Sequence, residues 1–155
     1  HEDGYRMLHR QGRALGDALI GAVRAACENH AASIDASTVD VLLPAQTRAN
    51  FCSLAPHRTY EFHEAGEQRT RVYLLRLGKV EFVGIQPEVS SSFGAAVRAA
   101  RPGNVFFATL VNGGQKYLPA PDAYEKITYE AMNSGFAAGS HERLLETILA
   151  ALDAA

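Results

Sequence analysis

Residues 70–85 of the chain read TRVYLLRLGKVEFVGI, and this stretch decides the fold. Two runs rich in β-branched and aromatic side chains, residues 70–77 and 80–85, are separated only by Gly78 and Lys79. Such runs are typical of strands, and a two-residue link that begins with glycine suits a tight hairpin turn. The sequence therefore predicts an antiparallel hairpin over this stretch.

Further strands are predicted on both sides of the hairpin. Residues 105–111 form a continuous apolar run, which is typical of a strand covered on both faces, so we expect a central strand there. Residues 37–43 alternate in polarity and end at Pro44, which predicts another strand. Residues 48–68 show no clear period and predict a loop, with at most a short strand over residues 59–62.

Three helices are predicted from apolar residues at helical spacing. The first, residues 5–30, is long and amphipathic. The second, residues 93–100, follows the natural N-cap residues Ser90, Ser91 and Ser92. The last, residues 140–152, has a stripe of leucine and isoleucine. Packing the first and last helices on the faces of the sheet gives the predicted fold, a mixed α/β sheet that forms a single unit over residues 1–155.

The composition is that of an ordinary globular protein. The chain has 155 residues, 47% of them hydrophobic, and a formal net charge of -2. Its 15 basic and 17 acidic residues are interspersed, so we expect no nucleic-acid partner. A domain of this length buries about two-thirds of its unfolded surface and needs no metal merely to stay folded.

The ends of the chain and its cysteines lead to further expectations. Two cysteines, Cys27 and Cys52, are too few for a disulfide framework and are expected to be separate thiols. No apolar stretch has membrane-spanning length and no signal peptide opens the chain, so we expect no transmembrane segment and leave the cellular compartment open. Because the chain begins at His1 without methionine, we expect a fragment or a processed subunit.

Three motifs follow the first hairpin strand in order. They are GIQPE at residues 84–88, NGGQKYLP at residues 112–119 and YEKITYE at residues 124–130. Together with the apolar run between the first two, these motifs resemble those of the neutral/alkaline ceramidase family, and the resemblance covers nearly the whole chain. It implies that the chain is the C-terminal part of a ceramidase-like catalytic domain.

The resemblance also implies a zinc site. In this family one zinc is held by two histidines from earlier in the domain, by a glutamate that corresponds to Glu88 and by a tyrosine that corresponds to Tyr117. A second tyrosine, which corresponds to Tyr129, helps to polarise the substrate carbonyl. The two histidines would lie upstream of His1, so the implied partners are an upstream segment or subunit and an N-acyl lipid or other amide substrate, ceramide being the substrate of the family.

The sequence departs from the family pattern at three places. Gln86 and Pro87 stand where Pro-Gly is usual, Gly114 replaces the first tyrosine of the loop, and Ile127-Thr128 precede the Tyr-Glu pair. These departures leave the chemistry possible and the identity of the substrate open.

Amide hydrolysis explains why such residues would be used. Zinc lowers the pKa of a bound water to about 7 and stabilises charge on the carbonyl oxygen. A carboxylate such as Glu88 and a phenolate such as Tyr117 are suitable oxygen ligands, since the metal favours the deprotonated phenol. Tyr129, kept protonated, could donate a hydrogen bond to the developing oxyanion.

Without the family, simpler interpretations apply to the same residues. Glu88 would be an acidic residue in the first turn of the helix after Ser90, and the two tyrosines would be half-buried loop residues. The spacing of His57 and His63 fits no standard zinc site. The other four histidines are expected on helices or at helix ends, where solvated or capping roles dominate: His1, His9, His30 and His141.

Two hypotheses follow. In the first, the chain and an upstream segment form a zinc amidase, and the isolated chain binds zinc weakly and hydrolyses nothing. In the second, the chain is a non-catalytic structural or assembly subunit that keeps the fold.

Overall fold

The computed structural model describes residues 2–26, 33–48 and 59–154. The chain divides into two compact units, residues 1–30 and residues 31–155, which are described separately. Whether they form a single domain stays a prediction. The expectations for five positions lie outside the described residues: His1, Cys27, His30, Cys52 and His57.

The first unit contains the predicted amphipathic helix, α1 (Glu2–Ala25). Acidic residues in its first turn and Arg24 in its last turn match the helix dipole. None of its residues is buried. The large apolar side chains that it exposes are Tyr5, Met7, Leu8, Leu15, Leu19, Ile20 and Val23.

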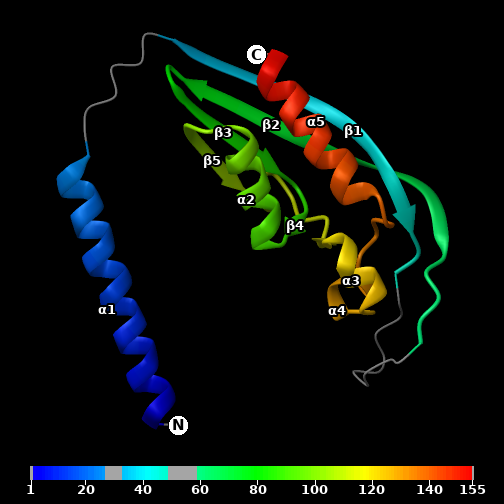
Figure 1. Ribbon diagram of the computed structural model, residues 1–155, viewed down its shortest axis with the longest axis horizontal. Coiled ribbons are helices and arrows are strands. Elements are labelled where there is room, and N and C mark those ends of the chain that lie inside the picture. The colour runs from blue at the N-terminus through cyan, green and yellow to red at the C-terminus, as the bar shows by residue number, and fades with distance from the viewer. Residues whose placement is uncertain (1, 27–32, 49–58, 155) are drawn as a thin grey trace. The chain divides into compact units, whose positions relative to one another are not determined.

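The second unit is built on a four-stranded sheet with the order β1-β2-β3-β5. The strands are β1 (Ile34–Gln46), β2 (Glu64–Leu77), β3 (Val80–Ile85) and β5 (Asn104–Ala108), as Figure 1 shows. The first three strands are antiparallel, whereas β5 runs parallel to β3. The predicted mixed sheet and the α/β fold class are therefore confirmed.

The hairpin of β2 and β3 forms as predicted. Val72 lies opposite Ile85, and Leu77 lies opposite Val80. Gly78 begins the turn with a φ of 59°, a conformation that glycine adopts without steric cost. Local sequence is sufficient to define this hairpin because both strands and the turn lie within residues 70–85.

The prediction that residues 105–111 form a central strand is wrong. Within the described ranges, β5 lies at the edge of its sheet, beside β3, and ends at Ala108. Val105 is buried, but Phe106 on the other face is 57% exposed. The run is continuously apolar because both faces of β5 carry apolar side chains, although helices cover only one of them.

The first two strands extend beyond their predicted bounds. Strand β1 continues past Pro44, which pairs with Glu67, and the register then shifts between Pro44 and Gln46. Proline is tolerated there because β1 is an edge strand with an irregularity at this point. Strand β2 begins at Glu64, and residues 59–62 form no strand. Its first residues are polar, and backbone pairing with β1 forms without an apolar pattern.

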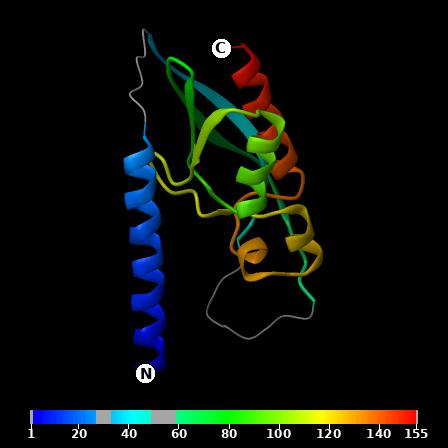
Figure 2. The same cartoon turned by 60° about the vertical axis from the view of Figure 1, so that its left-hand side comes forward.

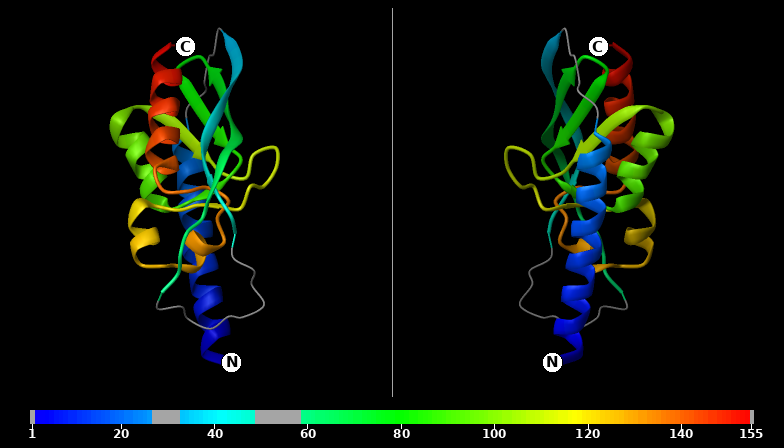
Figure 3. Two further views of the ribbon diagram at one scale, coloured as in Figure 1. Left: turned by 90° about the vertical axis from the view of Figure 1, so that its right-hand side faces the viewer. Right: turned by 90° about the vertical axis from the view of Figure 1, so that its left-hand side faces the viewer.

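Helices α2 (Ser91–Ala100) and α5 (Ser140–Ala154) lie on the same side of the sheet, as Figures 2 and 3 show. Ser90 is the N-cap of α2, as predicted, but its side chain makes no capping hydrogen bond. The core lies between these helices and the sheet. Its buried members include Val41, Leu43, Val72, Val83, Ile85, Phe93, Val97, Leu144, Ile148 and Leu152.

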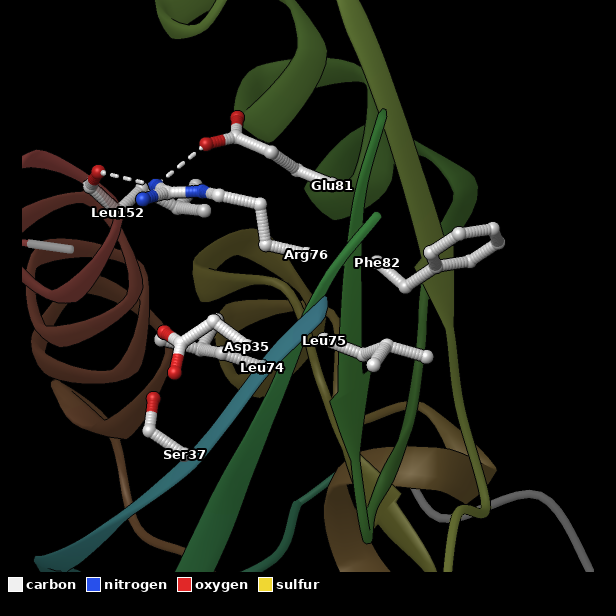
Figure 4. A pocket seen from close by; sticks show the side chains of 8 residues that line it. All are labelled: Asp35, Ser37, Leu74, Leu75, Arg76, Glu81, Phe82 and Leu152. Carbon is white, nitrogen blue, oxygen red and sulfur yellow. Dashed lines mark hydrogen bonds and ion pairs between the residues drawn. The ribbon is translucent and has the colours of Figure 1, made fainter. Parts of the chain in front are cut away.

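The other face of the sheet is apolar and exposed. Figure 4 shows Leu75 and Phe82 pointing away from α5, whereas Leu74 and Arg76 point toward it. Phe82 stacks on Phe106 with ring centroids 5.1 Å apart. We call the exposed side chains of Leu75, Phe82 and Phe106 the open face.

Four short elements among the described residues were not predicted from the sequence. They are β4 (Glu88–Val89), β6 (Tyr117–Leu118), α3 (Pro121–Glu125) and α4 (Tyr129–Met132). In the part of the chain that the structure describes, no helix combines the length and the apolar character needed to cross a membrane.

Candidate functional site

The candidate site lies where the chain leaves the parallel strands β3 and β5. Glu88 follows the end of β3, and the loop that leads to Tyr117 follows the end of β5. The carboxyl ends of parallel strands are the usual place for ligands in open α/β sheets. The position of the predicted site residues is therefore that of a typical α/β binding site.

Glu88 and Tyr117 lie side by side. Strands β4 and β6 pair in parallel, with Glu88 opposite Tyr117 and Val89 opposite Leu118. The backbone N–H of Glu88 donates to the carbonyl of Lys116 over 2.7 Å. Because residues opposite each other on adjacent strands project to the same face, the carboxylate and the phenol extend from one side of this short ladder.

The loop before β6 is fixed by sharp turns and by hydrogen bonds. Leu110, Asn112 and Lys116 have φ values of 59°, 54° and 60°, which are uncommon outside glycine and concentrate at functional sites. The side chain of Gln86 accepts from the backbone N–H of Arg71 over 3.1 Å and donates to the carbonyl of Asn112 over 3.4 Å. Gln86, a departure from the family pattern, thus links β2 to the loop.

Tyr129 reaches the same place from a different segment. It is the first residue of α4, whose N-cap Thr128 accepts a hydrogen bond from the backbone N–H of Ala131 over 3.3 Å. The Tyr129 ring meets the Tyr117 ring edge to face, with centroids 6.0 Å apart. All three residues predicted from the sequence, Glu88, Tyr117 and Tyr129, are therefore neighbours in the structure.

A pocket of about 360 Å³ opens beside Glu88 and Tyr117. Its lining combines polar side chains with an apolar wall. The lining residues are Glu88, Val89, Ser90, Tyr117, Leu118, Pro119, Ala120, Ala123, Thr128 and Glu130. Tyr129 is not one of them and instead packs against the Tyr117 ring. The pocket is therefore bordered by the Glu88 carboxylate, the Tyr117 phenol and small apolar groups.

The surroundings of Tyr117 favour its neutral form. Partial burial raises the pKa of the Tyr117 phenol, and the negative charge of Glu88 raises it further, with smaller effects of the same sign from Tyr129 and Glu130. A divalent cation between the Glu88 and Tyr117 oxygens would reverse this balance, since it favours the anionic form of both groups.

The residues present fit part of a metal site. A carboxylate and a phenol are both oxygen donors, and their register places them together. Zinc in a catalytic site takes three protein ligands and leaves a position for water or substrate. Within the described ranges, no group of three or more His, Cys, Asp and Glu side chains could hold a metal ion. The described residues therefore offer Glu88 and Tyr117 as a partial ligand set.

Two of the simpler interpretations can be tested directly. Glu88 lies in β4 and not in the first turn of α2, which begins at Ser91, so that interpretation is wrong. His141 at the start of α5 is not a solvated histidine, since its ring meets Phe93 edge to face at 4.8 Å. Burial lowers the pKa of His141. His63 is exposed and does not line the pocket.

Buried polar residues behind the site were not predicted from the sequence. Asn133 is 7% exposed, Ser134 0% and Gln46 5%. Asn133 and Ser134 follow the Tyr-Glu pair after Ala131 and Met132, which is the one signal that pointed to them, but the segment around them has no period from which burial could be inferred.

No protein-family model and no curated protein matches the sequence. Among solved structures, the chain is similar to one described as "Ceramidase complexed with C2", with a TM-score of 0.53 and 13% sequence identity. The similarity covers 76% of this chain, which spans only 29% of the length of that protein. At this level of identity the likeness concerns the fold alone. The chain has a ceramidase-like fold.

Proposed function

We propose that the chain is part of a zinc-dependent hydrolase of the neutral/alkaline ceramidase type, which cleaves an N-acyl amide bond, and that it forms the C-terminal part of the catalytic domain. The observation that carries this proposal is the pairing of Glu88 with Tyr117 across β4 and β6, with Tyr129 against the Tyr117 ring. The ceramidase-like fold supports it.

Glu88 and Tyr117 would hold the metal through their oxygen atoms. As the resemblance implies, the remaining two ligands would be histidines from an upstream segment. When bound, zinc supplies a Lewis acid and a water that ionises near neutral pH. Tyr117 would give up its phenolic proton on binding the metal, and Glu88 would bind as the carboxylate.

Tyr129 would act on the substrate carbonyl. A phenol that keeps its proton can donate a hydrogen bond to the carbonyl oxygen as negative charge develops there. The apolar wall of the pocket, which includes Val89, Leu118 and Ala123, would contact the acyl group of the substrate. The polar side chains of the lining would then face the amide.

The test compares Glu88→Gln, Tyr117→Phe and Tyr129→Phe in the full-length protein. Glu88→Gln and Tyr117→Phe should lose zinc, because each removes a ligand. Tyr129→Phe is the matched control: it should keep zinc while its kcat on an N-acyl amide falls about 10²–10³-fold. Metal analysis, tyrosinate absorbance on zinc addition and hydrolysis of an N-acyl panel are the measurements.

The absorbance separates the two tyrosines. Zinc should produce a tyrosinate signal in the unmodified protein and in Tyr129→Phe, and none in Tyr117→Phe. Unchanged zinc content in the Glu88 and Tyr117 variants would reject the metal site. It would favour the second candidate, a non-catalytic assembly subunit, for which the exposed open face is the supporting observation.

A further inference from the structure

Two consecutive buried polar residues contact the two tyrosines of the site. Asn133 and Ser134 directly follow α4, and they are 7% and 0% exposed. Polar side chains this deeply buried require hydrogen-bond partners. Their partners include Tyr129 and Tyr117.

Asn133 binds the hydroxyl of Tyr129. Its side-chain Nδ2 donates to Tyr129 Oη over 3.2 Å, and its backbone N–H donates to the Tyr129 carbonyl over 2.9 Å. The two residues are therefore joined at both the side chain and the main chain. In this hydrogen bond the Tyr129 oxygen accepts, so the bond does not use the hydrogen of the Tyr129 hydroxyl. Accepting a hydrogen bond also polarises the hydroxyl and makes it a stronger donor.

Ser134 binds the main chain of Tyr117. Its Oγ lies 2.8 Å from the Tyr117 carbonyl oxygen and 3.0 Å from that of Phe136. The Phe136 carbonyl already accepts from Tyr124 Oη over 2.7 Å, and the Phe136 backbone N–H donates to Ser134 Oγ over 2.8 Å. The Ser134 hydroxyl has a single hydrogen, and we therefore assign its hydrogen bond to the Tyr117 carbonyl oxygen, which is the nearer of the two acceptors.

Gln46 anchors this dipeptide to the end of β1. Its Nε2 donates to the carbonyls of Ala131 and Ser134 over 2.8 and 3.2 Å. Its backbone N–H donates to the carbonyl of Gly135 over 2.9 Å. The segment that carries Asn133 and Ser134 is therefore tied to the sheet, so the two residues can transmit a fixed geometry to the tyrosines.

We propose that Asn133 and Ser134 form a positioning pair for the hydrolytic site. Asn133 orients the Tyr129 hydroxyl so that its hydrogen points to the substrate carbonyl, and Ser134 fixes the β6 main chain so that Tyr117 stays opposite Glu88. Neither residue lines the pocket. The inference rests on the proposed function.

The first measurement needs no activity. In the 155-residue chain, Tyr129→Phe removes the acceptor of Asn133 while changing a side chain that is 47% exposed, so the variant should fold. The side-chain amide resonances of Asn133 should shift, and their hydrogen exchange should accelerate. The side-chain amide resonances of Gln46 should stay unchanged, because Gln46 donates to the backbone carbonyls of Ala131 and Ser134 and not to the Tyr129 hydroxyl. Tyr124→Phe is the matched control and should leave the Asn133 resonances in place. Unshifted Asn133 resonances in Tyr129→Phe would overturn the inference.

The second measurement separates the two residues in the full-length protein. Asn133→Leu, of similar shape, should lower kcat about 10-fold with KM and zinc content unchanged, and should have no further effect in a Tyr129→Phe background. If Asn133→Leu does not fold, Asn133→Asp replaces it in this test, because aspartate also lacks the Nδ2 donor. Ser134→Ala should weaken zinc affinity about 10-fold.

The outcomes distinguish this inference from the proposed function. If the unmodified protein holds zinc and hydrolyses the amide, but Asn133→Leu and Asn133→Asp keep full kcat, the positioning role is rejected alone. If the Asn133 resonances respond to Tyr129→Phe but the full-length protein holds no zinc, the proposed function fails and the positioning role for hydrolysis fails with it.

Discussion

Tyr124 is a half-buried tyrosine on α3, and its hydroxyl donates to the Phe136 carbonyl over 2.7 Å. Burial raises the pKa of Tyr124 to about 12. The folded state therefore binds the phenolic proton more tightly than the unfolded chain, in which tyrosine titrates near about 10. The stability that Tyr124 contributes is complete below about pH 10 and is lost as the pH rises toward about 12.

Tyr124→Phe should make stability less sensitive to alkali. At about pH 8 the variant should be less stable than the unmodified chain by about 1 kcal/mol, because it lacks the hydrogen bond to Phe136. Above about pH 10 the difference should shrink, since the unmodified chain alone must release this proton on unfolding. Urea unfolding at a series of pH values measures this, with the exposed Tyr5→Phe as control. Parallel curves for Tyr124→Phe and the unmodified chain would contradict it.

At the residue scale, the sequence predicted the site residues that belong to motifs and missed the residues whose role depends on packing. Glu88, Tyr117 and Tyr129 come from three separate motifs, and the structure places them together. Asn133 and Ser134 could not be predicted, because their importance depends on hydrogen bonds to the two tyrosines and on burial. Asn and Ser are common in exposed turns, so residue type alone favours the opposite interpretation.

At the element scale, two arginines from outside α5 cap its C-terminal end. The helix has no basic residue in its own last turn. Arg76 and Arg101 donate to the Leu152 carbonyl over 3.5 and 3.2 Å. Both also bind the Glu81 carboxylate, as Figure 4 shows for Arg76. Burial would raise the pKa of Glu81, but hydrogen bonds from Arg101 and Arg76 outweigh it and hold the pKa below its usual value.

Glu81→Ala should weaken the attachment of α5 to the sheet at this end. The side chain of Glu81 is 14% exposed, and its removal leaves both arginines without their shared carboxylate, at a cost of about 2 kcal/mol. Because the folded pKa is lowered, this contribution is present at neutral pH and is lost as the pH falls below about 4. Thermal unfolding at about pH 7 and about pH 3 should show a stability difference from the unmodified chain that narrows in acid. An equal difference at both pH values would contradict the ion-pair explanation.

The elements themselves were predictable to different degrees. The hairpin of β2 and β3 was predicted, because its turn and both strands are local. The edge position of β5 was not, since the neighbours of a strand are set by residues far away in sequence. β4 and β6 are two-residue strands that are defined by their pairing with each other. They are too short to show a periodic pattern in the sequence.

At the largest scale described, the unit of residues 31–155, the sheet has one face covered by helices of that unit and one open face. Strand β5 has a phenylalanine side chain on each face of the sheet. Phe106 on the open face is 57% exposed, whereas Phe107 on the covered face packs on Phe93 with ring centroids 5.5 Å apart. Phe82 and Leu75 extend the open face across β3 and β2. Adjacent exposed apolar side chains of this kind favour association or aggregation.

Phe106→Lys and Phe107→Lys should therefore differ sharply. Phe106→Lys should cost about 1 kcal/mol, from the lost stacking on Phe82, and should reduce self-association. Phe107→Lys places a charge against the core and should cost about 3 kcal/mol or more. Denaturant unfolding and sedimentation velocity are the measurements. Equal destabilisation by the two variants would show that the faces are not distinguished as described.

The pairing of β4 with β6 has a consequence for the order of assembly. Glu88 and Tyr117 lie at the two ends of one continuous segment that runs from β4 through α2 and β5 to β6, so folding of this segment brings them together. Contacts this close in sequence form early relative to contacts with remote parts of a chain. Under the proposed function, Glu88 and Tyr117 would already be adjacent when a segment that carries the histidine ligands docks against them.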